Sequence, residues 1–544
     1  MKLDELLGVA AAKWPHGNAL IFPESELTFS NLQANAKRKA RSLIGAGVRA
    51  GDHVGILSLN LPEYVESLFA ISMAGATAVP LNARYRGAEL KQVIADSDIR
   101  LLFTTSQFDD RVDFSAHLTD CYPEISTSLD PRQLRIEEAP LLKSVVMFEA
   151  SQKPGFISLT DFDQWGGDVT DDAVTDRSAS VGLESICLMI YTSGTTSVPK
   201  GCRLSHGAFV RNAAAEQERF AITEDDCLWD PLPFFHMSSL LPMIASMWAG
   251  AAYASDTHFD VDRALEQIYR VEPTILFPAF PAIMGDLLSH QDFQADKMGR
   301  VRLVNNVAPA SRLLENMAQL PQAVHISAYG LTEISGVACH GSADETDLER
   351  AHTCGRTFEG IDARIVCPES QSELGPDEEG EIQLRGYALF TDYYKDPEKT
   401  RAVMTEDGWL RTGDIGALDA QGRLSFRGRL KDMLKVGGEN VAALEIEGLL
   451  LTHPAVKMAQ VVGAPHDRLG EVPAAFIELS DGAHCAEEEI IQFCRNNIAS
   501  FKVPRIVRFV DEWPSSATKI QKFKLIELLA RPQPLDASSE ATDE

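Results

Sequence analysis

Residues 191–201 combine hydroxyls, glycines and one lysine in the order Tyr-Thr-Ser-Gly-Thr-Thr-Ser-Val-Pro-Lys-Gly. Glycine lets a backbone approach an anion closely, hydroxyls donate hydrogen bonds, and lysine adds a mobile positive charge. The spacing of a Walker loop is absent, and a flexible Ser/Gly/Thr-rich connector is the alternative. An apolar run precedes the segment and Ser205 is a candidate N-cap of a helix after it, which favours a phosphate-binding loop. Its predicted donors are Thr192, Ser193, Gly194, Thr195, Thr196 and Lys200.

Residues 328–333, Ala-Tyr-Gly-Leu-Thr-Glu, supply the groups that a metal–nucleotide complex needs. A hard cation prefers a carboxylate oxygen beside phosphates, and an aromatic face suits a purine. The alternative is that Glu333 caps a helix and that Tyr329 belongs to a core.

Two further charged residues are candidates for chemistry. Asp414, in Trp409-Leu-Arg-Thr-Gly-Asp414, offers the two acceptor oxygens that suit a diol, although an Asp after Gly is usually a turn residue. Lys519, in Thr518-Lys-Ile-Gln-Lys522, supplies an ammonium near the end of the chain. The alternative for Lys519 is a solvated basic face shared with Lys522 and Lys524.

Taken in order, these segments resemble the signatures of the adenylate-forming superfamily, which includes AMP-forming acyl-CoA synthetases, luciferases and adenylation domains. The resemblance covers nearly the whole chain. It implies that Glu333 helps to bind Mg2+, that Thr332 contacts the α-phosphate, and that Lys519 bridges the acid and the α-phosphate. The remaining nucleotide contacts implied by the resemblance are Ala308, Pro309, Tyr329, Gly330, Asp414 and Arg429.

The chain departs from the family pattern at three places. Ser197 stands where the family usually has Gly, and we expect a modest effect. Asn306 also replaces a Gly, and because Asn tolerates a left-handed backbone we expect the turn to survive there. The Gly before Lys519 is missing, which would displace the lysine.

The second half-reaction of such enzymes requires a domain rotation, for which the resemblance implies Lys431 as the hinge. The rotation would bring the loop that contains Lys435, Gly437 and Gly438 to the active site, where the glycines leave room for a pantetheine arm. The resemblance also makes His236 the gate of the acid site, with a buried core histidine as the alternative. Candidates for an apolar acid pocket are Phe280, Met284, Val307 and Ile334.

Asp230, in Trp229-Asp-Pro231, precedes a proline and is expected to start a turn rather than to bind an amino group. A simple or hydrophobic carboxylic acid is therefore favoured over an amino acid, and its chain length and ring content stay open.

Length, charge and cysteine content exclude several classes of protein. A chain of 544 residues with 45% hydrophobic content should form several domains. Its net charge of −29 argues against nucleic acid and anionic membrane surfaces as partners. The 9 cysteines are scattered without a Cys-x-x-Cys pair, and the N-terminus lacks a signal-like apolar core, so a reduced, cytoplasmic protein is expected. Residues 240–254 are shorter than the ~20 residues of a membrane span and predict a buried helix and strand. A homodimer is compatible with these features.

Strand-like runs alternate with helical patterns through most of the chain, which predicts an α/β fold. We expect a large N-terminal domain, residues 1–428, with two mainly parallel α/β sheet subdomains and a small β subdomain. A small, mobile α+β C-terminal domain should follow over residues 429–544. Residues 105–180 are expected to form a long surface excursion, and the acidic tail at 536–544 to be disordered.

The predicted function is ATP-dependent activation of a carboxylic acid as acyl-AMP, with release of pyrophosphate, followed by transfer to CoA as a thioester. ATP, Mg2+ and CoA are the implied cofactors and co-substrates. Two alternatives stay open: adenylation with transfer to a carrier protein, and a non-catalytic nucleotide or acyl-adenylate binding protein.

Overall fold

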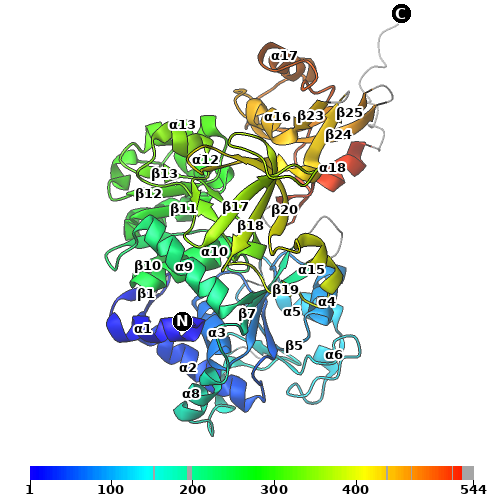
Figure 1. The fold of residues 1–544 in the computed structure, drawn as a ribbon. Helices are drawn as coiled ribbons and strands as arrows, with labels where there is room; N and C mark the ends of the chain where they lie inside the picture. The colour runs from blue at the N-terminus through cyan, green and yellow to red at the C-terminus, as the bar shows by residue number, and fades with distance from the viewer. Residues whose placement is uncertain are drawn as a thin grey trace, which may run out of the picture.

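A computed structural model describes residues 1–108, 110–150, 153–192, 199–436, 439–466, 469–516 and 519–529 (Figure 1). Its helices cover both faces of two large sheets, and the C-terminal elements (orange to red) lie at one end beside a smaller β-sheet. The predicted fold class is confirmed.

The first large sheet has the strand order β13-β12-β11-β9-β10-β1-β2. All its pairings are parallel except that of β1 with β2. Its strands are β1 (Asn18–Ile21), β2 (Glu26–Thr28), β9 (Cys227–Trp229), β10 (Ala252–Ala254), β11 (Ile275–Ala279), β12 (Leu303–Asn306) and β13 (Val324–Ile326). Because β9, β11 and β12 run in parallel, their carboxyl ends meet at one edge, where open α/β sheets usually bind ligands.

The second large sheet has the order β19-β8-β7-β4-β3-β5-β6, and only β8 and β19 introduce antiparallel pairs. Its strands are β3 (His53–Ile56), β4 (Thr77–Pro80), β5 (Ile99–Thr104), β6 (Ser144–Met147), β7 (Ile186–Thr192), β8 (Lys200–Ser205) and β19 (Asp392–Tyr393). The expectation of a surface excursion over residues 105–180 is wrong in part. That stretch contributes edge strand β6 and a covering helix with buried Phe114 and Leu118.

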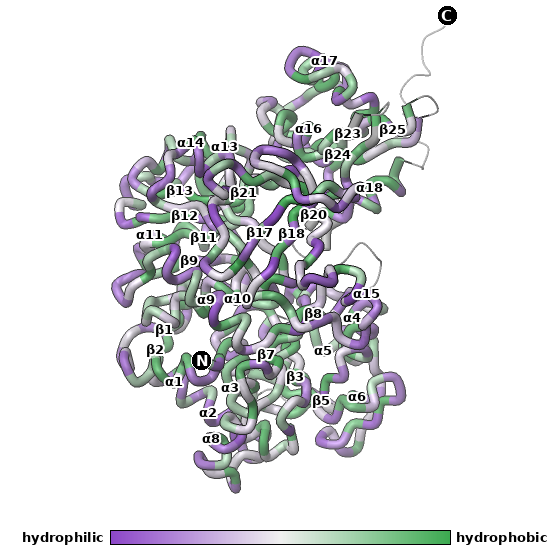
Figure 2. The backbone as a smooth tube through the Cα atoms, viewed as in Figure 1, coloured by the Kyte–Doolittle hydropathy of each residue, from purple (hydrophilic) through white to green (hydrophobic). Residues whose placement is uncertain are grey.

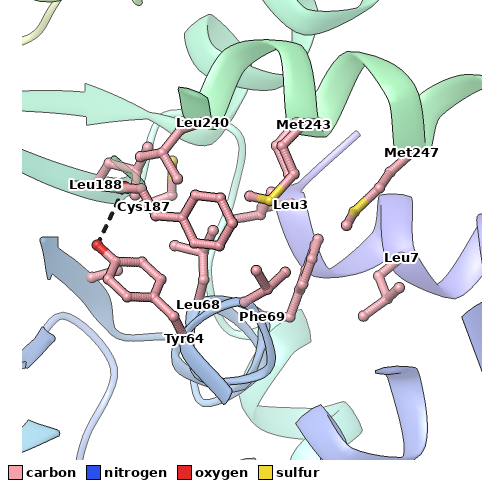
Figure 3. Close-up of a cluster of buried hydrophobic side chains, with 14 of the residues drawn as sticks. Leu3, Leu7, Tyr64, Leu68, Phe69, Cys187, Leu188, Leu240, Met243 and Met247 are labelled. Atoms are coloured by element: carbon pink, nitrogen blue, oxygen red, sulfur yellow. Dashed lines mark hydrogen bonds between the residues drawn. The ribbon is translucent and has the colours of Figure 1, made fainter. Parts of the chain in front are cut away.

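Apolar residues from both sheets and from the helices between them form the main core. Figure 3 shows Met243 and Met247 of one helix near Leu3 and Leu7 of the first helix. Hydropathy follows this arrangement, with apolar residues along β7 and hydrophilic ones on outer helices such as α8 (Figure 2). The helices are α1 (Leu3–Lys13), α2 (Phe29–Gly45), α3 (Pro62–Met73), α4 (Gly87–Asp96), α5 (Phe114–Cys121), α6 (Glu124–Thr127), α7 (Leu159–Gln164), α8 (Asp171–Ala179), α9 (His206–Phe220), α10 (Met237–Ala249), α11 (Val261–Val271), α12 (Pro281–Ser289), α13 (Ala310–Gln319), α14 (Asp347–His352), α15 (Pro397–Val403), α16 (Ala443–Leu450), α17 (Glu487–Asn497) and α18 (Lys522–Leu529).

Smaller sheets follow in the second half of the chain. β14 (Ala328–Tyr329), β15 (Cys339–His340) and β16 (Arg356–Thr357) form one, and β17 (Ile361–Val366), β18 (Gly380–Gly386), β20 (Leu410–Leu418) and β21 (Leu424–Arg429) form an antiparallel one. The C-terminal sheet contains β22 (Met433–Val436), β23 (Glu439–Ala442), β24 (Val456–His466), β25 (Gly470–Leu479) and β26 (Ile506–Phe509). A short hairpin of β27 (Ser515–Ser516) and β28 (Lys519–Ile520) precedes α18, and the 3-10 turns are η1 (Ala295–Met298), η2 (Thr332–Ile334) and η3 (Leu430–Asp432). Residues 536–544 lie outside the described residues.

In the described part of the chain, no helix is both long and apolar enough to cross a membrane. The expected helix and strand within residues 240–254 are present as most of α10 and as β10.

A buried polar network fixes the segment between β9 and α10. Asp230 accepts the Leu232 backbone N–H at 2.7 Å and lies 2.7 Å from the Tyr253 hydroxyl, which in turn lies 2.8 Å from Ser239. The Asn60 side chain spans the same segment, since it donates to the Leu232 carbonyl and accepts the N–H of Phe234. Asp230 thus starts a turn, as expected.

Burial raises the pKa of Asp230 from 3.8 to about 8, against the opposing effect of these hydrogen bonds. The folded state therefore retains a proton that the unfolded state loses, and stability should fall as pH rises from about 4 to about 8. We expect Asp230→Asn to flatten this dependence by at most about 1.4 kcal/mol per pH unit. Urea unfolding of wild type and variant at pH 5.5 and 7.5 measures it.

Asp226, which precedes β9, is the matched control. Burial would raise its pKa, but hydrogen bonds from Arg302 and Thr274 outweigh burial and lower it, so it stays ionised across this range. Asp226→Asn should therefore leave the pH dependence unchanged. An equal pH dependence in wild type and Asp230→Asn would contradict the assignment to Asp230.

Candidate active site

The strands on either side of the predicted phosphate loop, β7 and β8, pair with each other. Thr192 pairs with Lys200, and Tyr191 with Gly201. The hairpin leads into α9, where Ser205 accepts the Ala208 N–H as the predicted N-cap. The other predicted donors, Ser193, Gly194, Thr195 and Thr196, and also Ser197, lie outside the described residues, so their role stays a prediction.

Lys200 and Glu333 both contact Tyr393. The Lys200 ammonium is 5.0 Å from the centroid of the Tyr393 ring, and the Tyr393 hydroxyl donates to Glu333 Oε1 at 2.6 Å. Burial and the negative charge of Glu333 raise the pKa of Tyr393 above its ordinary value. The Tyr393 hydroxyl therefore stays protonated and can donate to Glu333. The structure thus brings together the predicted phosphate lysine and the predicted metal carboxylate.

Tyr329, Asp414 and Arg429 form a second group. The Tyr329 hydroxyl donates to Asp414 Oδ2 at 2.8 Å, and Arg429 Nε is 3.4 Å from Asp414 Oδ1. Arg429 lies opposite Asp414 in the β20–β21 register, and the Tyr329 ring stacks on Phe426 with 5.7 Å between centroids. Tyr329 and Asp414 are buried whereas Arg429 is partly exposed, so the charge of the arginine faces the surface of the site.

The segment from Tyr329 to Glu333 joins the two groups. A side chain at Gly330 would place its Cβ 2.0 Å from the Gly336 carbonyl oxygen, so close backbone packing requires glycine there. Thr332 begins η2 and is half-buried.

The predicted adenine segment follows β12. Ala308 is half-buried, and Pro309 is the N-cap of α13. A Cβ at Gly448 of α16 would lie 4.0 Å from Pro309 Cβ, so the C-terminal region contacts this segment. Asn306 makes no use of the left-handed backbone that asparagine tolerates, because it ends β12 in extended conformation. The positive φ, 53°, belongs to its partner Ala279 on β11.

His236 is the N-cap residue of α10, and its ring contacts that of Phe235 at 4.7 Å between centroids. The Asn60 and Asp230 network holds the loop that leads to it. The four predicted pocket residues do not form one group: Met284 belongs to the core under α11 and α12, whereas Ile334 belongs to the core around Tyr329. Phe280 is the N-cap of α12, and Val307 is exposed.

The C-terminal candidates are placed through their backbones. Lys519 pairs with Ser516 in the β27–β28 hairpin, and its side chain lies outside the described part. Lys522 does not belong to a solvated basic face, because its ammonium donates to buried Glu447 at 2.6 Å and to the Val461 carbonyl. Lys431 lies in η3, which connects β21 of the four-stranded antiparallel sheet to β22 of the C-terminal sheet. Burial lowers the pKa of Lys431. Lys435 is on β22, and Gly437 and Gly438 lie outside the described residues.

Sequence reasoning missed Tyr393, Phe426 and Asn60, which hold the predicted residues. The sequence offers only weak signals for these three residues. Tyr393 and Phe426 are aromatic residues within short strands, and Asn60 follows a predicted strand.

The two residue groups lie where large α/β sheets and a smaller C-terminal sheet meet, the architecture expected of an AMP-forming ligase. The AMP-binding enzyme model matches residues 7–394, and the AMP-binding enzyme C-terminal domain model matches residues 445–519. The chain belongs to the AMP-binding enzyme family. The prediction of an acyl-CoA synthetase is confirmed as its enzyme class.

Similar proteins cover almost the whole chain. The Bacillus subtilis protein YngI, provisionally named an acyl-CoA synthetase, is 33% identical, and the alignment covers 96% of both chains. The mitochondrial medium-chain acyl-CoA ligase ACSF2 of Rattus norvegicus is 31% identical over 96% of this chain and 87% of its own. The crystal structure of the anthranilate CoA ligase AuaEII with anthranoyl-AMP is similar with a TM-score of 0.84 and 27% identity, covering 97% of this chain and 98% of that one.

Tyr329→Phe tests the bond that positions Asp414. We expect KM for ATP to rise roughly 2- to 10-fold, because one buried hydrogen bond to a carboxylate is lost. Steady-state pyrophosphate release with varied ATP measures it. The control is Tyr387→Phe, which removes a hydroxyl that donates to Asn212 at 3.2 Å and should change KM less than about twofold. Equal effects of the two variants would argue against a special role for Tyr329.

Proposed function

We propose that residues 329–333 align ATP between the two residue groups while a carboxylate attacks the α-phosphorus. The observation that carries this proposal is that one five-residue segment, from Tyr329 to Glu333, contacts both Asp414 and Tyr393. Asp414 would accept from the ribose hydroxyls at one end, and Lys200 would contact the β- and γ-phosphates at the other. Such positioning, together with fixed charge, is what phosphoryl and nucleotidyl transfer require of a protein.

In the first half-reaction a carboxylate oxygen forms a bond to the α-phosphorus, and the bond from that phosphorus to pyrophosphate breaks. The products are acyl-AMP and pyrophosphate. Thr332 would donate to the α-phosphate, and the Lys519 ammonium would offset charge on the acid and the phosphate.

Glu333 is the residue that would hold Mg2+. A carboxylate oxygen is a preferred ligand of this cation, and Tyr393 fixes one oxygen of the group without neutralising its charge. When bound, the cation would neutralise charge on the phosphates, and Lys200 would supply a further positive charge to them.

In the second half-reaction the CoA sulfur bonds to the acyl carbon, the acyl–phosphate bond breaks, AMP leaves, and the thiol proton passes to solvent. The site cannot present Lys519 and the thiol to one carbonyl together, so we propose rotation of residues 429–544 about Lys431. The position of Lys431 in a short turn between two sheets supports this role. The loop with Lys435, Gly437 and Gly438 would then line the thiol path.

The acid is proposed to be largely apolar, with His236 at its entrance. Relatives support this class: one is named for medium-chain acids, and a Mycobacterium tuberculosis ligase 33% identical to the chain is named for a dioxo-octahydroindenyl propanoyl group. Asp230 is buried in its own network, which argues against binding of an amino-acid ammonium.

A cytoplasmic setting and a homodimer remain proposals. The 9 cysteines, all free thiols in the structure, support a reducing compartment.

Pyrophosphate release across a panel of acids, with and without CoA, tests the function. We expect release with apolar acids and a thioester only when CoA is present. Release without any CoA-dependent thioester would favour transfer to a carrier protein. The absence of release with every acid would overturn the proposal.

Lys519→Ala tests the catalytic lysine. We expect adenylation to fall by roughly 100- to 1,000-fold, as for loss of one transition-state donor, while thioester formation from supplied acyl-AMP stays within a few-fold. The matched control is Lys524→Ala, which removes the same charge from an exposed position on α18. If both half-reactions survive in Lys519→Ala, or if Lys524→Ala has the same effect, the assignment is wrong.

A further inference from the structure

A short hairpin near the end of the described chain carries Lys519, the proposed catalytic lysine. Ser516 pairs with Lys519, and the Gln521 N–H donates to the Pro514 carbonyl at 2.7 Å. This register places Lys519 at the outer end of the hairpin and α18 at its base. Because a two-stranded hairpin is marginally stable by itself, its direction depends on the contacts made at its base.

Lys522, the first residue of α18, makes such a contact. Its ammonium donates to Glu447 Oε1 at 2.6 Å and to the Val461 carbonyl at 3.0 Å. The same oxygen of Glu447 accepts the Val461 N–H at 2.7 Å. The Lys522 side chain is 20% exposed and that of Glu447 is 6% exposed, so the pair is largely shielded from water. The three residues form a closed set of hydrogen bonds that joins α18, α16 and β24.

The place of this set at the edge of the C-terminal sheet explains its value to the fold. Among the described strands, β24 pairs only with β25, and an edge strand leaves backbone groups unpaired. The side chains of Glu447 and Lys522 occupy both backbone groups of Val461. Leu525, less than one turn further along α18, packs on the same sheet in the core that contains Phe476, and Figure 1 shows α18 beside β24. The start of α18 is therefore fixed by hydrogen bonds and by apolar packing together.

The pair also lies near the proposed hinge. Burial is the main cause of the lowered pKa of Lys431, and the positive charges of Arg429 and Lys522 lower it further. Lys522 and Glu447 both belong to residues 429–544, the part of the chain proposed to rotate. The ion pair and the hairpin would therefore move together as one body.

We propose that Lys522 is a positioning residue whose ion pair with Glu447 holds the hairpin so that the Lys519 ammonium reaches the acid and the α-phosphate during adenylation. This inference rests on the proposed function, and it gives Lys522 no contact with the substrates. Lys522 acts through the short segment that links it to Lys519. A displacement of about 1 Å at a reacting group can cost about 100-fold in rate, so a loosened hairpin should be costly.

The two half-reactions, measured separately, test the proposal. For Lys522→Met, with an apolar acid that the wild type activates, we expect pyrophosphate release to fall roughly 10- to 100-fold. Thioester formation from supplied acyl-AMP and CoA should stay within a few-fold. A general loss of the C-terminal fold would lower both rates, because both half-reactions use this domain.

A second variant guards against misfolding. Lys522→Met leaves the Glu447 carboxylate buried without its cation, which is destabilising. The double variant Lys522→Met/Glu447→Gln removes both charges and should show the same difference between the half-reactions. Thermal unfolding of each variant shows whether it is folded.

A double-mutant cycle tests whether Lys522 acts through Lys519. If it does, Lys519→Ala/Lys522→Met should release pyrophosphate within about threefold of Lys519→Ala alone, since the lysine to be positioned is already absent. Lys522→Arg keeps a charged donor for Glu447 and should recover part of the rate that Lys522→Met loses.

The matched control is Lys502→Met. The Lys502 ammonium binds Glu445 of the same helix α16, also at 2.6 Å, but it comes from the segment before β26 rather than from the Lys519 hairpin. This pair is more exposed than that of Lys522, and its loss should leave both half-reactions within about twofold of wild type.

The outcomes separate the two levels of the argument. If the wild type releases no pyrophosphate with any acid, the proposed function fails. If Lys519→Ala adenylates at the wild-type rate, the role of Lys519 fails and that of Lys522 with it. The role of Lys522 alone is overturned if folded Lys522→Met keeps the wild-type rate of adenylation, loses both half-reactions equally, or adds its full effect to that of Lys519→Ala.

Discussion

The hydrogen bond from Tyr329 to Asp414 is the interaction on which the site depends. It brings a carboxylate from the β20–β21 sheet to a segment that follows the first large sheet, so two separate sheets contribute to one site. A buried carboxylate is costly unless it is paired and hydrogen-bonded. Here the Tyr329 hydroxyl and the nearby Arg429 compensate Asp414, and both oxygens have a partner on the protein. Asp414 is therefore held in place by contacts within the protein.

The parallel sheets explain why distant segments meet. Strands β9, β11 and β12 end at one edge, and each is followed by a segment that carries a candidate ligand-binding residue. The edge alone does not fix those segments, because loops are free to move. Asn60, Asp230 and Tyr253 supply that restraint for the loop before His236, at the cost of keeping a carboxyl group protonated in the core.

Local signals predicted most of the fold, and contacts between remote segments account for what was missed. The alternation of strand and helix patterns identified both parallel sheets, and Ser205 was correctly expected to cap a helix. By contrast, Tyr393 reaches Glu333 only because β19 pairs with β8, a pairing that has no signal in the sequence. Likewise, no signal in the sequence predicts that Phe426 stacks on the ring of Tyr329. At Asn306 the tolerance of asparagine for a left-handed backbone is not used, since the residue ends β12, and the positive φ lies at its pairing partner Ala279.

Tyr393 also bears on how an acidic protein binds a triphosphate. With a net charge of −29, the long-range field opposes a polyanion, so binding depends on local cations that are available to it. A lysine beside a carboxylate would normally form an ion pair with it and lose part of its capacity to bind phosphate. In the described structure Tyr393 contacts both residues: its ring faces the Lys200 ammonium, and its hydroxyl donates to one oxygen of Glu333. Because a ring face attracts an ammonium without forming an ion pair with it, the contact with Tyr393 leaves Lys200 available for the proposed phosphate contact and Glu333 available for the proposed cation. A phenylalanine at this position would hold the lysine but leave Glu333 without its fixed donor, and a leucine would do neither.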